Sequence, residues 1–285
     1  MLTVLESITL SEDYLKKKGI ESARVNAELL LADILNCKRL DLYLKFDQPL
    51  SEKEINKYRE YISRRGKNEP LQYILGKVEF YGLTLKVDRS VLIPRPETEL
   101  LVELILEETD KESVLNILDI GCGSGNISLA LAKDLPLAKI TGADISPEAI
   151  SLARENAKIN NITGNVEFIE VDIFNDVSGK VPGKFDIIVS NPPYVSKNDF
   201  EKLQPEIKNY EPQGAVTDFS DGYSFYRRII NLANELLKPS GKLYFEVAEG
   251  QSGNIKNLLE ENNFVNISVK KDFAGIERII SGEKG

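Results

Sequence analysis

The sequence predicts an α/β protein whose main domain is a mostly parallel sheet with helices on both faces, preceded by a small helical domain. Residues 2–67 repeat apolar side chains at helical spacing and contain few β-branched runs. Two short β-favouring runs follow at 78–81 and 83–87, hinged at Gly82 like a hairpin. From Val114 onward strand-like and helix-like segments alternate, which is typical of a parallel sheet covered by helices. The length of 285 residues fits about two domains.

The N-terminal helices are placed by apolar spacing and by one clear start signal. Ser51 followed by Glu54 is a capping box that opens a helix, and Gly66 is expected to stop it. The apolar residues at helical spacing upstream are Ala27, Leu30, Leu31, Ile34 and Leu35. We therefore expect residues 1–70 to form the helical domain and residues 71–93 to form a β-hairpin linker.

The second domain, residues 94–285, begins after a break in regular structure. The prolines of Ile93-Pro94-Arg95-Pro96 cause that break, and an amphipathic helix follows from Glu97 to about Glu108. Seven strands are then expected at 114–120, 138–143, 165–171, 185–190, 241–247, 264–270 and 276–281, with helices at 125–134, 147–160, 222–237 and 250–261. No helix separates the last two strands, so an antiparallel pair is expected to close the sheet.

Composition excludes several classes of function. The chain has no histidine and no tryptophan and only two cysteines, so imidazole-based triads and zinc sites built on histidine are excluded, and no metal is expected. The formal charge of −9 opposes non-specific binding to nucleic acid phosphates. The N-terminus does not resemble a secretory signal, and no apolar run of about 18 residues appears. We expect a cytoplasmic protein with reduced thiols and no membrane association.

A glycine-rich turn follows the first strand of the predicted sheet. The strand runs into Gly121-Cys122-Gly123-Ser124-Gly125 and then into a helix, so the backbone turns tightly there and can approach a ligand closely. The G-x-G-x-G spacing differs from the dinucleotide fingerprint, which places glycine or alanine where this chain has Asn126. Alone, the pattern also fits a plain glycine turn.

Acidic residues follow the next two strands. Asp144 lies about twenty residues beyond the glycines, where a carboxylate can accept hydrogen bonds from both hydroxyls of a ribose. Capping the helix that starts at Ser146 is the alternative role, and the two roles can coexist. Asp172 could accept from an adenine amino group while Ile173 or Phe174 covers the ring, although a solvated loop acid fits almost equally well.

The sharpest motif is Asn191-Pro192-Pro193-Tyr194, directly after the apolar strand 185–190. It lies at the carboxyl edge, where open α/β sheets bind ligands. The prolines stiffen the turn and donate no N–H, so the Asn191 side-chain oxygen and the Pro192 carbonyl can each accept one hydrogen of an incoming NH2 group. Tyr194 supplies a ring for a planar amide or base. A purely structural turn is the alternative.

The glycine loop, Asp144 and the NPPY motif together resemble class I S-adenosylmethionine-dependent methyltransferases that act on exocyclic or amide nitrogen. Further segments narrow the resemblance to the HemK/PrmC family, and the match spans nearly the whole chain. These segments are Glu69-Pro70-Leu71-Gln72-Tyr73-Ile74-Leu75-Gly76, Glu79-Phe80-Tyr81-Gly82, Leu92-Ile93-Pro94-Arg95-Pro96-Glu97-Thr98-Glu99 and Asp221-Gly222-Tyr223-Ser224-Phe225-Tyr226-Arg227-Arg228.

The resemblance implies a fold and an activity. Members of this family are protein-(glutamine-N5) methyltransferases that modify the GGQ glutamine of class I peptide chain release factors, the proteins of translation termination. A helical N-terminal domain is joined by a hairpin to a Rossmann-like methyltransferase domain. The implied cofactor is S-adenosylmethionine, with S-adenosylhomocysteine as product. The implied partners are release factors, and a monomer without direct nucleic acid contact is expected.

The resemblance also assigns residues. Gly121 to Gly125, with Cys122 and Ser124 inside the loop, surround the methionyl part of the cofactor, and Asp144 becomes the ribose ligand. Asn191, Pro192, Pro193 and Tyr194 become the glutamine site. Family members often carry an aromatic residue next to the acid of the third-strand loop, whereas this chain has Ile173, so adenine stacking there is less certain.

Other interpretations stay open on sequence alone. A DNA adenine N6-methyltransferase also presents an NH2 group to this motif, although the acidic charge counts against it. A cofactor-binding module without catalysis and a nicotinamide-linked oxidoreductase are disfavoured by Asn126 and by the NPPY loop. The turn 97–99 either borders the cofactor or simply starts a helix. Arg64, Arg65 and Lys67 form either a partner surface or a solvated helix end.

Overall fold

The computed structural model describes residues 2–285, and the chain divides into two compact units. The first unit contains the chain up to Lys77 together with Gln204–Tyr210. The second contains Val78–Leu203 and Glu211–Gly285. The chain therefore leaves the second unit, contributes seven residues to the first, and returns.

The first unit is helical, as the apolar spacing predicts. Its core is made of apolar side chains that include Val4, Ile8, Leu15, Leu30, Leu31, Leu42, Leu50, Tyr58 and Ile74. Its elements are α1 (Val4–Lys17), α2 (Ala23–Ile34), the 3-10 helix η1 (Arg39–Leu44), α3 (Glu52–Arg65), α4 (Leu71–Leu75) and α9 (Pro205–Tyr210). The predicted capping box is confirmed, because the Ser51 hydroxyl accepts from the Glu54 N–H while the Glu54 carboxylate accepts from the Ser51 N–H.

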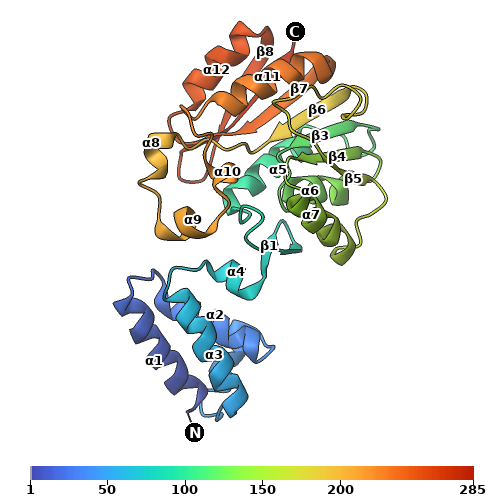
Figure 1. Ribbon diagram of the computed structural model, residues 1–285. Coiled ribbons are helices and arrows are strands. Elements are labelled where there is room, and N and C mark those ends of the chain that lie inside the picture. The colour runs from blue at the N-terminus through green and yellow to red at the C-terminus, as the bar shows by residue number, and fades with distance from the viewer. Residues whose placement is uncertain (1) are drawn as a thin grey trace. The chain divides into compact units, whose positions relative to one another are not determined.

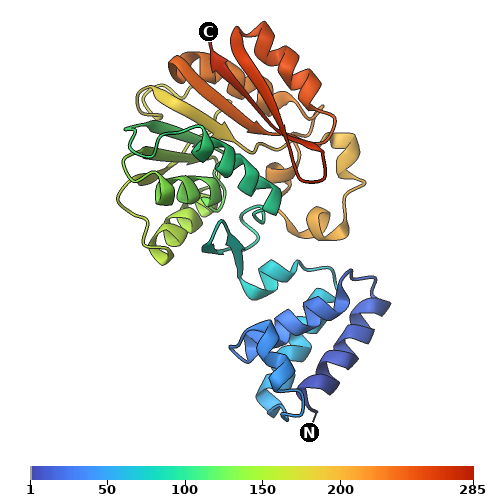
Figure 2. The ribbon, with the colours of Figure 1, turned by 180° about the vertical axis from the view of Figure 1, so that it is seen from behind.

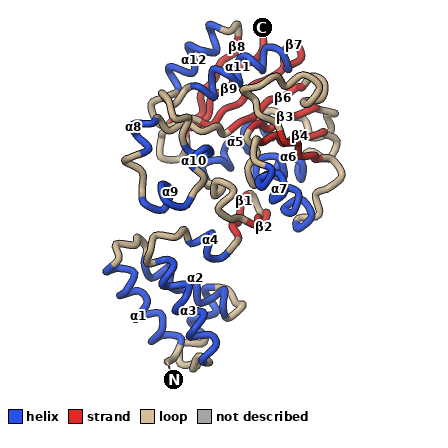
Figure 3. The backbone as a smooth tube through the Cα atoms, viewed as in Figure 1, coloured by secondary structure: helices blue, strands red, loops and turns tan. Residues whose placement is uncertain are grey.

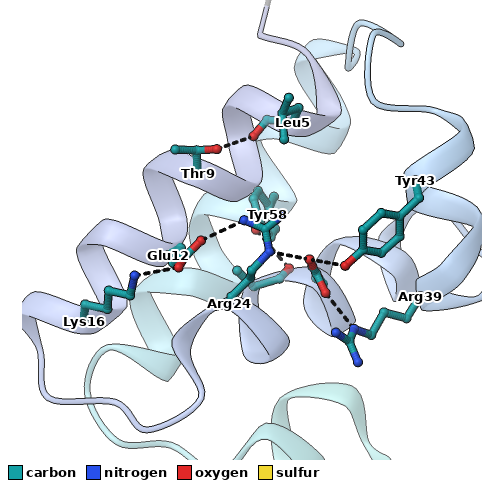
Figure 4. A network of polar contacts seen from close by, with 10 residues as sticks. Leu5, Thr9, Glu12, Lys16, Arg24, Arg39, Tyr43 and Tyr58 are labelled. Atoms are coloured by element: carbon teal, nitrogen blue, oxygen red, sulfur yellow. Dashed lines mark hydrogen bonds and ion pairs between the residues drawn. The ribbon is translucent and has the colours of Figure 1, made fainter.

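A buried carboxylate joins three elements of this unit. The Glu28 side chain in α2 is fully buried and accepts from Arg24 at 2.9 Å, from Arg39 at 2.6 Å and from the Tyr43 hydroxyl at 3.2 Å. Arg24 also reaches Glu12 in α1 at 3.1 Å, and Figure 4 shows these side chains converging from α1, α2 and η1. A buried charge requires such partners, so this network fixes how the helices pack.

The second unit holds a seven-stranded sheet in the order β5-β4-β3-β6-β7-β9-β8 (Figure 3). The first five of these strands pair in parallel, whereas β9 runs antiparallel to both β7 and β8. The strands are β3 (Asn116–Ile120), β4 (Lys139–Asp144), β5 (Val166–Glu170), β6 (Phe185–Ser190), β7 (Leu237–Glu246), β8 (Phe264–Lys271) and β9 (Glu277–Lys284). The predicted fold class and the closing antiparallel pair are confirmed.

Helices cover both faces of this sheet. Along the strands successive residues alternate between two apolar clusters: Ile117 belongs to one and Leu118 to the other, as do Tyr244 and Phe245. One cluster packs under α11 and α12 (Figure 1), and the other under α5, α6 and α7, with α5 visible from behind in Figure 2. The helices are α5 (Glu99–Glu107), α6 (Asn126–Asp134), α7 (Pro147–Ile159), α11 (Ser224–Leu236) and α12 (Ser252–Glu261).

Smaller elements complete the chain and differ most from expectation. The hairpin strands β1 (Lys77–Phe80) and β2 (Leu83–Lys86) form a separate two-stranded sheet, and η2 (Pro96–Thr98) precedes α5. The sequence pattern missed α8 (Lys197–Phe200), α9 and α10 (Gln213–Val216), because helices of four to six residues carry too few apolar repeats. No helix between residues 2 and 285 is long and apolar enough to cross a bilayer.

Candidate active site

A cavity of about 640 Å³ opens at the carboxyl edge of the sheet. The chain proceeds from β3 to β4 and β5 on one side and places β6 and β7 on the other, so the strand order reverses between β3 and β6. Ligands of open α/β sheets bind at such a reversal, and the volume is that of a small-molecule site. The loops after β3, β4, β5 and β6 all contribute to its wall.

The structure brings most of the predicted site residues together in this cavity. Among the described residues, Cys122, Ser124, Gly125 and Tyr194 are the predicted ones that do not line it. The predicted residues that do line it are Gly121, Gly123, Asp144, Asp172, Ile173, Asn191, Pro192 and Pro193, and Phe174 joins them.

The three glycines of the loop after β3 have different physical roles. All three have positive φ, at +76° for Gly121, +52° for Gly123 and +81° for Gly125. A Cβ added at Gly121 or Gly123 would meet no protein atom within 4 Å, so the space beside them is open to a ligand. A Cβ at Gly125 would lie 3.1 Å from Phe168 and 3.2 Å from Ala153. Gly125 therefore permits the start of α6 to pack closely against Phe168 and Ala153.

Asp119 lies beneath this loop and is fully buried in β3. One of its oxygens accepts from the Ser128 N–H at 3.1 Å and from the Ser128 hydroxyl at 2.6 Å, which ties β3 to the start of α6. Burial raises the pKa of this carboxyl to about 7. The residue resembled an ordinary strand residue in the sequence, so no pattern indicated it.

Asp144 lines the cavity and is held by two main-chain donors. One carboxylate oxygen accepts from the Gly123 N–H at 2.9 Å and the other from the Ser146 N–H at 2.9 Å. Each oxygen keeps another acceptor site, so two hydroxyls can still bind. Burial raises the pKa of Asp144, against the effect of these N–H donors. Ser146 itself caps α7 through the Ala149 N–H, so Asp144 is not the N-cap.

The loop after β5 is held from within and from α11. Asp172 accepts from the Phe174 N–H at 2.9 Å and from the Asn175 amide at 2.8 Å. The guanidinium of Arg228 donates to the main-chain oxygens of Ile173 and Asn175. Ile173 and Phe174 both face the cavity, so the loop presents an apolar wall beside an acid.

The NPPY loop follows β6 and is anchored at both ends. The Ser190 hydroxyl donates to the main-chain oxygen of Ile120 at 2.7 Å, which joins β6 to β3 at the cavity. Behind the loop, the Gln251 side chain donates to the main-chain oxygen of Tyr194 at 3.0 Å. Burial raises the pKa of Tyr194 to about 12, so its phenol stays protonated. Tyr194 packs against the core under α11 and α12.

Gly222 lies in the segment 221–228, for which the sequence alone offered no physical role. Its φ is +86°, and an added Cβ would lie 2.7 Å from the main-chain oxygen of Tyr194. Only glycine allows this approach, which lets residues 221–228 pack against the NPPY loop. The neighbouring Tyr226 hydroxyl donates to the main-chain oxygen of Glu246 at 2.8 Å.

Asn191 has a partner that the sequence did not reveal. Its side-chain nitrogen donates to the Thr98 hydroxyl oxygen at 3.3 Å, and that hydroxyl donates to the Glu246 carboxylate at 2.6 Å. Thr98 and Glu246 are 1% and 4% exposed. Burial raises the pKa of Glu246 to about 7, and the hydrogen bonds from Thr98 and Asn191 oppose that shift. These three residues come from η2, the loop after β6, and the end of β7.

Two further segments complete the cavity wall. Arg89 to Leu92 form one side, and Pro212, Gly214 and Ala215 form another. Glu211 links the two, because its buried carboxylate accepts from Arg95 at 2.6 Å and from the Ile93 N–H at 3.4 Å. No pattern in the sequence indicated residues 89–91 or 212–215.

The described residues fit S-adenosylmethionine. Open space beside Gly121 and Gly123 can admit a ligand chain, Asp144 has acceptors for two hydroxyls, and the loop 172–174 offers an acid beside an apolar wall. A nucleoside with an extended polar substituent needs these three features.

Comparisons with known proteins match both parts of the chain. Residues 6–76 match the PrmC N-terminal domain, and residues 111–281 match a methyltransferase domain. A release factor glutamine methyltransferase of Fusobacterium nucleatum subsp. nucleatum is 44% identical over 98% of this chain and 78% of its own. Another, from Geobacter sulfurreducens, is 41% identical over 99% of this chain and 97% of its own.

Solved structures agree on the fold. A methyltransferase from Pyrococcus furiosus has a TM-score of 0.53 at 22% identity, covering 72% of this chain and 90% of its own. The fold is therefore that of a class I methyltransferase, and the protein is an S-adenosylmethionine-dependent methyltransferase. With full-length relatives at this identity and both domain models matched, the chain belongs to the HemK/PrmC family of release factor glutamine methyltransferases.

Proposed function

We propose that this enzyme methylates the side-chain amide nitrogen (N5) of the GGQ glutamine in class I peptide chain release factors. The observation that carries the proposal is the position of Asn191, Pro192 and Pro193 in the same cavity as Gly121 and Asp144. An acceptor loop for an NH2 group thus adjoins a nucleoside site. The relatives named release factor glutamine methyltransferase support this choice of substrate.

The reaction requires geometry more than a general base. A carboxamide nitrogen is a weak nucleophile because its lone pair is delocalised into the carbonyl. S-adenosylmethionine supplies, when bound, a sulfonium methyl group that is already activated for transfer. Aligning the nitrogen with that methyl group is worth about 7 to 11 kcal/mol in well-oriented intramolecular reactions. Asn191 and Pro192 are proposed to provide this alignment, each accepting one hydrogen of the amide NH2.

The same two acceptors can also stabilise the charge that develops during methyl transfer. Positive charge develops on the attacking nitrogen, and the Asn191 oxygen and the Pro192 carbonyl can stabilise it as it forms. The methylated amide is then strongly acidic and releases its proton to water. The chain has no histidine, and this mechanism needs none.

The cofactor roles are assigned from the cavity wall. Gly121 and Gly123 are proposed to surround the methionyl part, and Asp144 to bind the ribose hydroxyls. Asp172 is proposed to accept from the adenine amino group, with Ile173 and Phe174 covering the ring. Cys122, Ser124 and Gly125 shape the loop, and Tyr194 supports the NPPY turn.

The remaining proposals concern the whole chain. Residues 1–70 are proposed to recognise the release factor and residues 94–285 to carry the chemistry. The expected linker 71–93 is divided between the two units, because α4 packs in the helical core and the chain from Val78 onward belongs to the second unit. A protein substrate of the translation machinery supports a cytoplasmic location, and we propose that the enzyme works there as a monomer. The net charge of −9 disfavours direct nucleic acid binding.

The rival function is DNA adenine N6-methylation, because the NPPY loop would accept that NH2 group equally well. Transfer of labelled methyl from S-adenosylmethionine separates the two. We would compare purified release factor, the same factor with the GGQ glutamine changed to alanine, and duplex DNA. Label on the unmodified factor alone is expected. Label on DNA alone, or on no substrate, contradicts the proposal.

A further inference from the structure

Thr98 and Glu246 form a buried polar pair directly behind Asn191. Thr98 lies in η2 and Glu246 at the end of β7, and neither lines the cavity. Their hydroxyl and carboxylate are 2.6 Å apart, and the hydroxyl lies 3.3 Å from the Asn191 side-chain nitrogen. Asn191 lines the cavity and donates to the Thr98 hydroxyl, and it also hydrogen-bonds to the Glu246 carboxylate, which helps to lower the pKa of that group.

The direction of these hydrogen bonds follows from the number of hydrogens available. A threonine hydroxyl has one hydrogen, and here it is donated to the Glu246 carboxylate. The hydroxyl can therefore offer only lone pairs to Asn191, so Asn191 must turn its NH2 end toward Thr98. The carbonyl oxygen of the Asn191 amide is then turned away from the pair.

We propose that Thr98 and Glu246 are positioning residues that fix the orientation of the Asn191 amide, so that the cavity receives its oxygen and not its NH2 group. This inference rests on the proposed function, because it explains how an NH2-bearing substrate is selected. A rotated Asn191 would place a donor opposite the donors of the substrate amide and lose the hydrogen bond to the reacting nitrogen.

A purely structural tie between η2 and β7 is the rival explanation. A structural tie would affect folding stability and cofactor binding along with turnover. A positioning role lowers kcat and leaves cofactor binding unchanged, because Asn191 is proposed to contact the reacting amide while Asp144 and the glycine loop are proposed to hold the cofactor. Loss of the buried Thr98 hydroxyl lowers the melting temperature under either explanation. The two explanations therefore differ in which measured quantity changes.

Three variants test the proposal in the full-length enzyme. Thr98→Val keeps the shape of the side chain and removes the hydroxyl, and Thr98→Ser restores a hydroxyl. Tyr226→Phe is the matched control, since it removes a buried hydrogen bond to the main-chain oxygen of Glu246 and leaves Thr98 intact. We would measure kcat and KM for release factor methylation, the cofactor Kd and the melting temperature.

We expect kcat of Thr98→Val to fall by about tenfold or more, with cofactor Kd unchanged within about twofold. Thr98→Ser and Tyr226→Phe should stay within about threefold of the wild-type kcat. A wild-type kcat in Thr98→Val overturns the proposal, as does an equal loss in Tyr226→Phe.

A second measurement needs no protein substrate and separates this inference from the proposed function. The side-chain NH2 resonance of Asn191 can be identified by its loss in Asn191→Ala. In the wild type its hydrogens should exchange slowly with water, and in Thr98→Val they should exchange faster by about tenfold or more. Equal exchange in both proteins overturns the positioning role. Slow exchange without release factor methylation would instead contradict the proposed function alone.

Discussion

Two residues of the cavity are expected to separate cofactor binding from turnover. Asp144→Ala removes the acceptors of two ribose hydroxyls and should weaken cofactor binding by about tenfold to a hundredfold. Asn191→Ala should lower kcat by about a hundredfold or more with cofactor Kd nearly unchanged. Calorimetric titration and single-turnover transfer measure the two quantities. Equal loss of both in Asn191→Ala would show that Asn191 serves the cofactor or the fold.

Glu246 gives the reaction an expected pH dependence. Below its pKa of about 7 the carboxyl becomes neutral and can donate to Thr98, which reverses the hydrogen bond toward Asn191. We therefore expect kcat to fall as pH falls through about 7, and Glu246→Gln to flatten that profile between about pH 6 and 8. A wild-type kcat that stays constant over this range would contradict the expectation.

The charges that face Glu246 are Glu97, which raises its pKa, and Arg278, which lowers it. The hydroxyls of Tyr194 and Tyr226 lie near enough for Glu246 to raise their pKa values. Folding stability should change in the opposite sense from activity. Because the folded-state pKa of Glu246 is raised, its stabilising contribution is complete below about 4.5 and is lost as pH rises through about 7.

At the scale of elements, β4 depends on a glycine for its packing against β5. A Cβ at Gly142 would lie 2.6 Å from the Phe168 ring and 2.9 Å from the Ser128 hydroxyl. A Cβ at Gly125 would lie 3.1 Å from the same ring, so Phe168 packs closely against both β4 and the loop 121–125.

Gly142→Ala is expected to destabilise the protein by about 1 to 3 kcal/mol, because the buried Phe168 ring has to move. Gly164→Ala is the matched control: it is exposed and an added Cβ there meets no atom within 4 Å. Urea denaturation measures the free energy of unfolding of both variants. Equal stability of the two would show that the core around Phe168 relaxes without cost.

The sequence predicted those elements and proposed site residues that are indicated by a pattern of a few consecutive residues. Ser51 and Glu54 are three residues apart, and the glycine loop, Asp144 and the NPPY motif each follow a strand directly. Strand ends in a parallel sheet meet at one edge, so their proximity could be inferred. Thr98 and Glu246 lie 148 residues apart, and no periodicity indicates that they meet. Short helices such as α8 carry no repeat at all.

At the scale of the whole molecule, the path of the chain was not predictable from domain boundaries. Residues 204–210 belong to the helical unit although they lie between two segments of the methyltransferase unit. Within the helical unit, the buried guanidinium of Arg65 pairs with Glu206, and the Tyr210 hydroxyl donates to the main-chain oxygen of Lys67 at 2.9 Å. These contacts hold the inserted segment.

Glu206→Gln removes a charge from a partly exposed carboxylate and leaves the Arg65 cation buried. Glu206 is about a third exposed, so solvent screens the ion pair. We expect the free energy of unfolding to fall by roughly 1 to 2 kcal/mol. The main-chain amides of α2 and α3 should therefore exchange their hydrogens with water faster in the variant. Lys202→Gln, which breaks an exposed pair with Asp199, should leave that exchange unchanged. If both variants change the exchange rates equally, the Arg65–Glu206 pair does not stabilise the helical unit specifically.

The cavity is proposed to direct a methyl group onto one amide nitrogen. Fragmentation mass spectrometry can locate that methyl group in the release factor peptide that contains the GGQ sequence, after incubation with the enzyme and S-adenosylmethionine. We expect a single added methyl group on the side-chain nitrogen of that glutamine, and none when Asn191→Ala replaces the wild type. A methyl group on another atom, or equal methylation by the variant, would contradict this expectation.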